Sequence, residues 1–560
     1  MTTGKKDNKI RGYLKVMAPA VIISFAVCFL VLLYAPLELY FSNKIDLWFD
    51  VYLLLEIFGL LFLLGFVLCN IVYFILWIIN EKLYKFSILA GFVFFFCTYV
   101  QGNFLVGNLP ALDGRVIEWS FYKTERISSA LLWIVVVSGV ILAVKFLHMD
   151  RVISYAKYAS IFITLMLSLT IITLGIMEDG FERMKPRLVT NEYLYEYSED
   201  TNFVIFLLDC FDSKKYAEIA GNHPEYEDIL EDFTYYPNTV SAYPFTKQSI
   251  PYILSGEWFE NQTDFTEYYE DVCANSPFLE KLNSQGYKLG FYEDEAPLGD
   301  ESILRFENIQ NTKLKVSSFW GFSKCVLKLA GYRYAPFELK RFCVTNIFDL
   351  YNFKQGETSE TQFSSTNYLF YDNLKNMDVT YSKDKQFKFI HIFGPHGPYV
   401  YNEQAEYVYP GGTGSYDINV EATMTIVDAF LNKLKDAGVY DNSVIIIMSD
   451  HGYYYQDEMR PDAMGRQNAL LFVKGINEKH AYTVSQAPIS FEDLQGAFDE
   501  LLKGKTDTEV FHIAEDAKRE RRYLYYPIVN EDSIIYEYVQ TGYATDEETM
   551  IPTGKEYKLQ

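Results

Sequence analysis

The chain has 560 residues and a formal net charge of −24 at pH 7, with 50% of its residues hydrophobic and 17% aromatic. Its length exceeds that of one ordinary domain, and the acidic total excludes the basic charge profile of a nucleic-acid-binding protein. The 7 cysteines are too few in a chain of this length for a disulfide scaffold. Cys325 and Cys343 could still form one disulfide if their region lies outside the cell.

Five long apolar runs occupy the first part of the chain, residues 1–178. Each run is close to the ~20 residues that a helix needs to cross a bilayer. Five such runs in succession, with almost no charge inside them, favour membrane spans over buried helices of a large soluble protein. The predicted spans are 16–37, 57–79, 86–106, 127–146 and 161–177.

The orientation of these spans follows from the distribution of lysine and arginine, which concentrate in cytoplasmic segments. Basic residues cluster before the first span and in the second and fourth loops, so we expect the N-terminus to be cytoplasmic and residues after 177 to lie outside. The first span has a basic flank but is too long for the apolar core of a signal peptide, and we interpret it as an uncleaved anchor. The basic residues are Lys5, Lys6, Lys9, Arg11, Lys15, Lys82, Lys85, Lys145, Arg151 and Lys157.

Beyond the spans, residues 179–200 are polar and predict a linker. From residue 201 to 515, strand and helix patterns alternate, with strands predicted at 203–208, 287–292, 387–392 and 443–448. This alternation predicts an α/β domain with a mostly parallel sheet. Residues 516–560 are rich in Tyr, Ile and Val and predict a small antiparallel sheet packed on that domain.

Charged side chains follow three of the predicted strands, at the point where each strand ends. Asp209 follows 203–208, His396 follows 387–392, and Asp450 and His451 follow 443–448. In open α/β sheets, ligands collect beyond the carboxyl ends of the strands. Asp oxygen and His nitrogen are both good ligands for a divalent metal, so the sequence predicts a metal site at this edge.

The candidate nucleophile is Thr246, at the start of a short predicted helix. Helix N-termini favour anions, and a hydroxyl bound to a divalent metal can ionise at neutral pH. The alternative is that Thr246 only caps the helix, which threonine often does.

Four segments resemble the alkaline phosphatase superfamily, in particular its sulfatase-like branch. Residues 202–209 match the first metal-binding strand, and 246–256 match the sulfatase nucleophile signature. Residues 391–399, His-Ile-Phe-Gly-Pro-His-Gly-Pro-Tyr, match the segment that supplies an active-site histidine, and 427–452 match the helix–strand–metal block. The resemblance covers roughly residues 200–515. With five spans in front, the chain is most similar to the membrane-bound lipoteichoic acid synthases and phosphoethanolamine transferases.

Two departures narrow the expected activity. Sulfatases need a Cys or Ser, converted to formylglycine and followed by Pro and Arg, where this chain has Thr246-Lys247-Gln248. Sulfate-ester hydrolysis is therefore not expected, whereas phosphotransferases use threonine. Lipoteichoic acid synthases usually have Glu at the first metal position, where this chain has Asp209. Sulfatases have paired aspartates on this strand, whereas here Asp209 is followed by Cys210.

The resemblance implies one divalent metal, Mn²⁺ or Zn²⁺ with Mg²⁺ as a further alternative, held by Asp209, Asp450 and His451 with Thr246 as fourth ligand. It implies transfer of phosphoglycerol or phosphoethanolamine from a membrane phospholipid, phosphatidylglycerol or phosphatidylethanolamine, to a cell-envelope glycan or polymer. A phospho-threonine is the expected intermediate. The alternatives are a phosphodiesterase or phosphatase that uses water, a sulfatase-like hydrolase, and an inactive scaffold.

Five further side chains have weaker assignments. The resemblance gives His396 the role of acid/base or phosphate ligand. Lys247 and Arg466 could reach a phosphate, or could be ordinary surface residues. His391 is either a buried core histidine or a contact of a metal ligand, and Trp320 either lines a headgroup pocket or belongs to the core.

Overall fold

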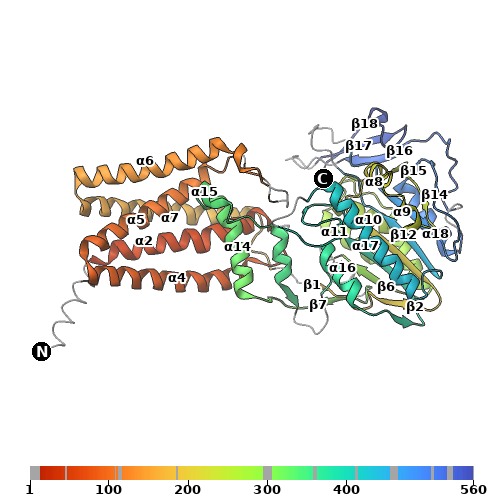
Figure 1. Cartoon of the computed structure of the whole chain (residues 1–560), viewed down its shortest axis with the longest axis horizontal. Helices are drawn as coiled ribbons and strands as arrows, with labels where there is room; N and C mark the ends of the chain where they lie inside the picture. The colour runs from red at the N-terminus through yellow and green to blue at the C-terminus, as the bar shows by residue number, and fades with distance from the viewer. Residues whose placement is uncertain are drawn as a thin grey trace. The chain divides into compact units, whose positions relative to one another are not determined.

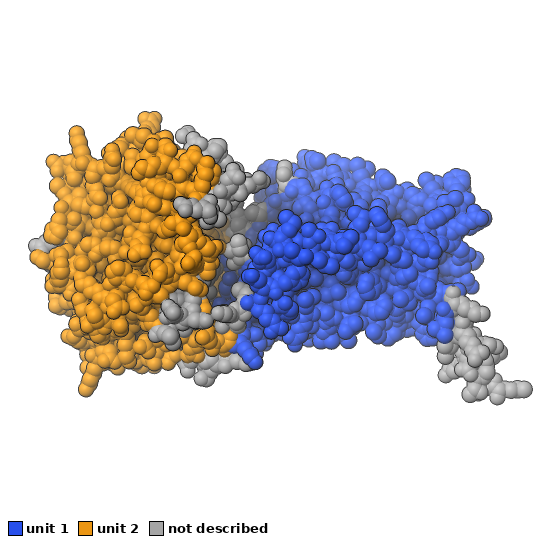
Figure 2. Space-filling view, turned by 180° about the vertical axis from the view of Figure 1, so that it is seen from behind, with its two compact units in different colours: residues 1–186, 313–357 blue, residues 187–312, 358–560 orange. Residues whose placement is uncertain are grey.

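The computed structural model describes residues 13–14, 16–44, 47–107, 109–110, 112, 117–183, 187–293, 305–356, 362–409, 414–453, 465–505, 510–525 and 534–558. Lys5, Lys6, Lys9, Arg11 and Lys15, used above to orient the spans, lie outside these residues. The chain divides into two compact units, coloured separately in Figure 2: unit 1 is residues 1–186 and 313–357, and unit 2 is residues 187–312 and 358–560.

Unit 1 contains the five predicted spans as helices of 24 to 29 residues, each long and apolar enough to cross a membrane (Figure 1). The prediction of five apolar helices is confirmed. Several begin earlier than predicted, because their first turns are polar and extend past the apolar run. The helices are α2 (Ala18–Phe29), which continues through the π-helical η1 (Leu30–Tyr34) into α3 (Ala35–Ser42), then α4 (Val51–Ile79), α5 (Glu81–Phe104), the short η3 (Trp119–Phe121), α6 (Lys123–Leu147) and α7 (Met149–Met177).

Residues 313–357 group with unit 1, although the predicted boundaries placed them inside the α/β domain. Their helix α14 shares a hydrophobic core with the apolar helices, in which the rings of Phe49 and Phe322 lie 5.0 Å apart. The Trp48 indole also donates a hydrogen bond to Leu350 O at 2.9 Å. The elements are β8 (Leu314–Val316), α14 (Phe319–Tyr334), α15 (Phe337–Lys340), η4 (Ile347–Phe353) and β9 (Lys354–Gly356), and β8 pairs with β9.

Unit 2 is built on a seven-stranded, mostly parallel sheet of order β14-β4-β13-β12-β3-β11-β6. The four neighbouring strands β12, β3, β11 and β6 are parallel, whereas β13 runs antiparallel to β12 and β4. The predicted α/β architecture is therefore confirmed. The strands are β3 (Asn202–Leu208), β4 (Thr234–Tyr235), β6 (Tyr287–Tyr292), β11 (Lys385–Ile392), β12 (Ser443–Met448), β13 (Leu471–Lys474) and β14 (Thr483–Val484).

Helices cover both faces of this sheet, and the central strand β3 shows how. Side chains three residues apart in a strand point to opposite faces. The Phe206 ring packs on Phe430 of α17 at 4.6 Å, and the Phe203 ring packs on Phe498 of α18 at 5.9 Å. All residues of β3 are buried, as the continuous apolar run predicted. The helices are α8 (Ser213–Ala220), α9 (Glu225–Ile229), α10 (Thr246–Ser255), α11 (Phe265–Asn275), α12 (Pro277–Ser284), α16 (Asn367–Asn376), α17 (Tyr416–Asp436), the short η5 (Phe491–Asp493) and α18 (Leu494–Leu502).

The predicted small antiparallel sheet at the C-terminus is present as a three-stranded sheet of order β16-β17-β18. It groups with the α/β domain in unit 2. Its strands are β16 (Arg521–Tyr525), β17 (Ile535–Gln540) and β18 (Met550–Tyr557), with the short η6 (Glu547–Thr549) before β18. Figure 1 shows these strands in blue. The small ladders of unit 2 are formed by β1 (Arg187–Val189) with β7 (Ile309–Asn311), β2 (Glu196–Ser198) with β10 (Thr380–Ser382), and β5 (Thr239–Val240) with β15 (Ile489–Ser490).

Candidate metal centre and active site

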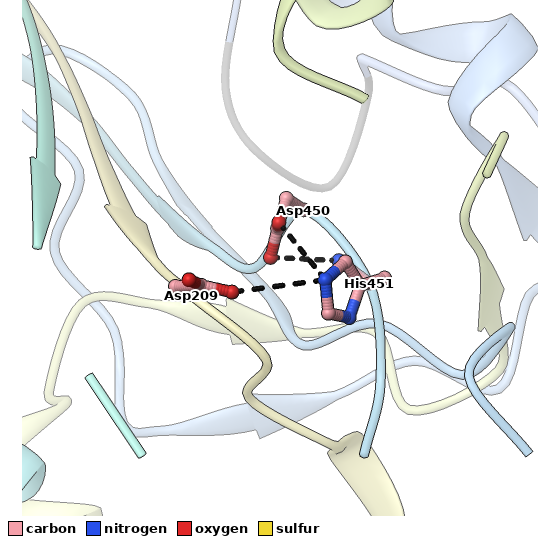
Figure 3. Close-up of side chains that lie close together, drawn as sticks. All are labelled: Asp209, Asp450 and His451. Atoms are coloured by element: carbon pink, nitrogen blue, oxygen red, sulfur yellow. Dashed lines mark hydrogen bonds and ion pairs between the residues drawn. The ribbon is translucent and has the colours of Figure 1, made fainter. Parts of the chain in front are cut away.

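Three side chains that could hold a metal ion meet at the carboxyl edge of the sheet in unit 2. Asp209 directly follows β3, and Asp450 and His451 follow β12. Because β3 and β12 are parallel neighbours with Leu207 opposite Met448, their last residues lie side by side. One ligand atom from each of the three residues lies within 4.8 Å of the others, and all three residues are buried. Figure 3 shows the three side chains facing one another.

Backbone and side-chain hydrogen bonds hold these ligands with free lone pairs at the centre. Asp450 Oδ1 accepts hydrogen bonds from the amides of Cys210 at 3.0 Å and His451 at 2.9 Å, whereas its buried Oδ2 has no hydrogen-bond partner among the described residues. His451 Nδ1 donates to Gly452 O at 2.8 Å, which leaves Nε2 as the free nitrogen. That Nε2 lies 3.2 Å from Asp450 Oδ2 and 3.7 Å from Asp209 Oδ1.

The electrostatics of this cluster fit a bound cation. Burial raises the pKa of Asp209 well above its usual range, and the nearby Asp450 adds to the shift. Burial also lowers the pKa of His451 to about 4, so its imidazole is neutral and able to act as a ligand. Two buried carboxylates are costly without a counter-charge, and a divalent ion supplies one. The donor set of two oxygens and one nitrogen suits Zn²⁺ or Mn²⁺.

Two residues beside the cluster, Gly452 and Gly394, lie so close to neighbouring atoms that a side chain would not fit easily. A Cβ on Gly452 would lie 2.8 Å from Asp212 Oδ2 and 2.9 Å from Asn468 O, so the residue after His451 has no room for a side chain. Gly394, at φ +51°, lies against the backbone of Asp209, whose N would be 3.2 Å from an added Cβ. The loop after β11 is therefore packed directly on the first metal ligand.

Thr246 lies at this cluster rather than capping its helix. Helix α10 begins at Thr246, its N-cap is Phe245, and no side chain caps it. The Thr246 hydroxyl instead donates to Asp209 Oδ1 at 3.4 Å. The hydroxyl therefore lies at the first turn of a helix, beside the candidate metal ligands.

Arg466 and His396 border the same site. The Arg466 guanidinium donates to Pro244 O at 3.0 Å. It also lies over the ring of Phe245, the residue that precedes Thr246, at 5.1 Å from the ring centroid. His396 Nδ1 donates to Gly397 O at 2.5 Å. Burial lowers the pKa of His396, and the charge of Arg466 adds to this effect, so its imidazole is neutral at pH 7.

His391 is buried in β11, and its imidazole lies beside Asp209, a candidate metal ligand. Its Nε2 lies 3.9 Å from Asp209 Oδ2 and has no hydrogen-bond partner among the described residues. Its Nδ1 pairs with the carboxylate of Glu293, which is 2% exposed. Burial alone would lower the pKa of His391, but the Glu293 carboxylate outweighs it and raises that pKa to about 10. A cationic imidazole therefore faces Asp209.

Glu293 is the functional residue that the sequence analysis missed. It directly follows β6, which pairs in parallel with β11, so it ends a strand at the same sheet edge as the metal ligands. The predicted strand 287–292 and the rule for carboxyl ends were sufficient to place it at this edge. Its pairing with His391 depends on β6 lying next to β11, which the sequence alone did not indicate.

Two of the predicted substrate-binding residues have exposed side chains. Lys247 follows Thr246 on α10, but its side chain is exposed. Trp320 belongs to α14 in unit 1, where its side chain is 72% exposed, so it is not a core residue. The two cysteines proposed as a disulfide, Cys325 and Cys343, are free thiols in the same unit.

Comparisons of the whole chain with known proteins identify its family. No curated protein matches the chain. Among solved structures, an alkaline phosphatase superfamily protein from Vibrio parahaemolyticus is 14% identical, with a TM-score of 0.37 over 66% of this chain and 81% of that one. The lipoteichoic acid synthase LtaP from Listeria monocytogenes is 13% identical, with a TM-score of 0.35 over 64% of this chain and 87% of that one. The phosphonate monoester hydrolase SpPMH from Silicibacter pomeroyi is also 13% identical, with a TM-score of 0.35 over 63% of this chain and 88% of that one. The family model for Sulfatase matches residues 201–503, more than half of the chain, and the protein therefore belongs to the sulfatase family.

Proposed function

We propose that the protein is a membrane-anchored, metal-dependent phosphotransferase that moves a phospho-headgroup from a phospholipid to a cell-envelope glycan or polymer. The observation that carries this proposal is the Thr246 hydroxyl, 3.4 Å from a carboxylate of the buried Asp209–Asp450–His451 cluster. A threonine cannot mature to formylglycine, so the position that defines sulfatases supports phosphoryl chemistry here.

The first half-reaction would join Thr246 to the headgroup. A divalent cation held by Asp209, Asp450 and His451 would supply positive charge that favours the ionised hydroxyl and offsets charge on the phosphate oxygens. Thr246 Oγ1 attacks the phosphorus of the donor lipid, and the bond from phosphorus to the glycerol oxygen of diacylglycerol breaks. His396 Nε2, which carries no proton because Nδ1 donates to Gly397 O, is assigned to take the proton that Thr246 Oγ1 loses and to give it to that leaving oxygen.

The second half-reaction would return the enzyme to its starting state. An acceptor hydroxyl attacks the phosphorus of the phospho-threonine, and the bond to Thr246 Oγ1 breaks. His396 is then the base that takes the acceptor's proton and returns it to Thr246 Oγ1, so both side chains end as they began. Arg466, held beside the nucleophile by its hydrogen bond to Pro244 O, is placed to pair with phosphate oxygens in both steps.

The five apolar helices give the proposed donor its chemical class. A phospholipid does not diffuse freely through water, and an enzyme anchored in the same bilayer meets it there. We assign phosphatidylglycerol or phosphatidylethanolamine as the donor, with a cytoplasmic N-terminus and an extracellular catalytic unit as the predicted orientation. The acceptor is then a hydroxyl of a glycan or polymer outside the membrane.

The proposal is tested by following the lipid product. Full-length protein in mixed micelles receives Mn²⁺ or Zn²⁺ and phosphatidylglycerol or phosphatidylethanolamine with a fluorescent acyl chain, and diacylglycerol is quantified by thin-layer chromatography. Wild type is expected to release diacylglycerol from one of the lipids, Asp450→Asn to release none, and Asp228→Asn, which changes an exposed carboxylate, to match wild type. Hydrolysis of aryl sulfate without any diacylglycerol would overturn the proposal in favour of a sulfatase.

A further inference from the structure

Unit 1 contains an apolar groove between the membrane helices and α14. The groove has a volume of about 510 Å³ and a wall that is mainly apolar. One side is formed by η1 and the first two-thirds of α4, and the other by α14 and Cys343. Its lining residues are Leu32, Leu61, Leu64, Gly65, Leu68, Trp320, Ser323, Lys324, Leu327, Lys328 and Cys343.

Helix α14 turns two different faces to its surroundings. Trp320, Lys324 and Leu327 recur at helical spacing and line the groove. Phe322, Val326 and Leu329 lie on another face and are buried in the core that α14 shares with the membrane helices. The groove-lining face is therefore fixed in place by the packing of the buried face.

Two lysines bring positive charge to the rim of this apolar wall. Lys324 is exposed and Lys328 is half-buried, one helical turn apart on α14. Within the described parts of the chain, neither ammonium group forms an ion pair, and Lys328 Nζ reaches only Val344 O, at 3.5 Å. Trp320, 72% exposed, lies one turn before Lys324 on the same face. An indole beside ammonium groups above aliphatic side chains is typical of the membrane–water interface.

The groove lies along the middle of α4. At ~1.5 Å per residue, the helix Val51–Ile79 spans about 44 Å, which exceeds the ~30 Å hydrocarbon core of a bilayer. Its ends therefore enter the headgroup regions. Leu61, Leu64 and Leu68 lie within about four residues, or ~6 Å, of the centre of α4, so this wall of the groove is at a depth that suits an acyl chain.

We propose that this groove binds one anionic phospholipid, with its phosphate between Lys324 and Lys328 and an acyl chain along Leu61, Leu64 and Leu68. The charge of the two lysines selects a lipid with net negative charge, because a zwitterionic headgroup would place its own ammonium beside theirs. Each lysine near a membrane surface contributes ~1 kcal/mol toward an anionic lipid, which together corresponds to a preference of about 30-fold. The site lies entirely within unit 1 and needs no catalytic chemistry.

The test measures retained lipid on the full chain. Native mass spectrometry follows full-length Thr246→Ala protein in EDTA, which lacks the proposed nucleophile and metal. The proposed reaction therefore cannot consume the lipid, and lipid binding is measured whether or not that reaction exists. The protein is mixed with equal amounts of phosphatidylglycerol and phosphatidylcholine in detergent. One phosphatidylglycerol per chain is expected, preferred at least tenfold over phosphatidylcholine. Lys324→Gln/Lys328→Gln should lose this preference, whereas Lys145→Gln/Lys157→Gln, which removes two lysines outside the groove, should keep it.

A second variant keeps both lysines and fills the groove. Leu64→Trp is expected to reduce retained phosphatidylglycerol at least tenfold, with unchanged monodispersity and helical circular dichroism. Phosphatidylglycerol brominated on its acyl chain should also quench tryptophan fluorescence less in Trp320→Phe than in the parent protein. Equal retention of the two lipids, or full retention by the double lysine variant, would overturn the proposal and leave only non-selective boundary lipid.

Discussion

Replacing Arg333 with methionine should loosen residues 313–357 from the membrane helices of unit 1. The Arg333 Nη1 lies 2.6 Å from Glu38 Oε1, and its Nε donates to Gly102 O at 2.9 Å. Both partners belong to apolar helices, so this one side chain ties the last turn of α14 to α3 and α5. Arg333→Met keeps much of the side-chain volume but leaves the Glu38 carboxylate without its partner.

The magnitude follows from the burial of the pair. Removing one partner of a fully buried ion pair costs ~3–5 kcal/mol, because a charge stays behind without compensation. The Glu38 side chain is 10% exposed, but that of Arg333 is 38% exposed, so solvent screening reduces the cost. We expect a loss of ~2–3 kcal/mol, which corresponds to local opening about 30 to 150 times more often.

Hydrogen exchange measured by mass spectrometry on the full-length protein in detergent reports this opening. Amides of α14 should exchange about 30 to 150 times faster in Arg333→Met than in wild type. Glu38→Gln/Arg333→Met should recover most of the protection, because the stranded carboxylate is then gone. Arg341→Met is the matched control, since Arg341 is 58% exposed and its one ion-pair partner among the described residues is exposed Glu338, and it should change exchange less than twofold.

Two results would refute this reasoning. Exchange of α14 in wild type at the rate of an unstructured peptide would mean that residues 313–357 do not fold with the membrane helices. Equal protection in wild type and Arg333→Met would mean that the Arg333–Glu38 pair does not hold the segment.

Three further predictions concern unit 2. Asp450→Asn should abolish the single Mn²⁺ or Zn²⁺ equivalent that isothermal titration calorimetry is expected to find in wild type; a retained full equivalent would place the metal elsewhere. Glu293→Gln should weaken that metal ~10–100-fold, because it releases His391 from its position against Asp209, and unchanged affinity would exclude this support. Burial lowers the pKa of Lys388 to about 7, so the unfolded chain binds more protons than the folded one between pH 7 and about 10. Stability should therefore rise with pH across that window by at most ~1.4 kcal/mol per unit, and denaturant titrations should show this slope in wild type but not in Lys388→Met; identical slopes would contradict the shift.

The parts of the fold that the sequence predicted are those set by local patterns. Five apolar runs became five helices because each satisfies its own backbone hydrogen bonds and needs no knowledge of its neighbours. The short run before Asp450 became a fully buried strand for a similar reason. Asp209, Asp450 and His451 then came together because parallel strands end at one edge of the sheet.

The parts that were missed depend on contacts between distant segments. Residues 313–357 interrupt the α/β domain in sequence, and Lys324, Lys328 and Arg333 give α14 a polar appearance that conceals its packing on membrane helices. Glu293 follows a predicted strand, but its pairing with His391 requires the strand order β11-β6. No short-range pattern encodes either arrangement.

The account's central claim, that Thr246 carries the transferred group, is tested most directly by intact mass spectrometry. Full-length wild type, Thr246→Ala and the control Thr266→Ala, which changes an exposed threonine on α11, are incubated with Mn²⁺ or Zn²⁺ and phosphatidylglycerol or phosphatidylethanolamine. The account predicts a covalent adduct with the mass of phosphoglycerol or phosphoethanolamine on wild type and Thr266→Ala, absent from Thr246→Ala. The same adduct on Thr246→Ala, or diacylglycerol release by that variant at the wild-type rate, would contradict it.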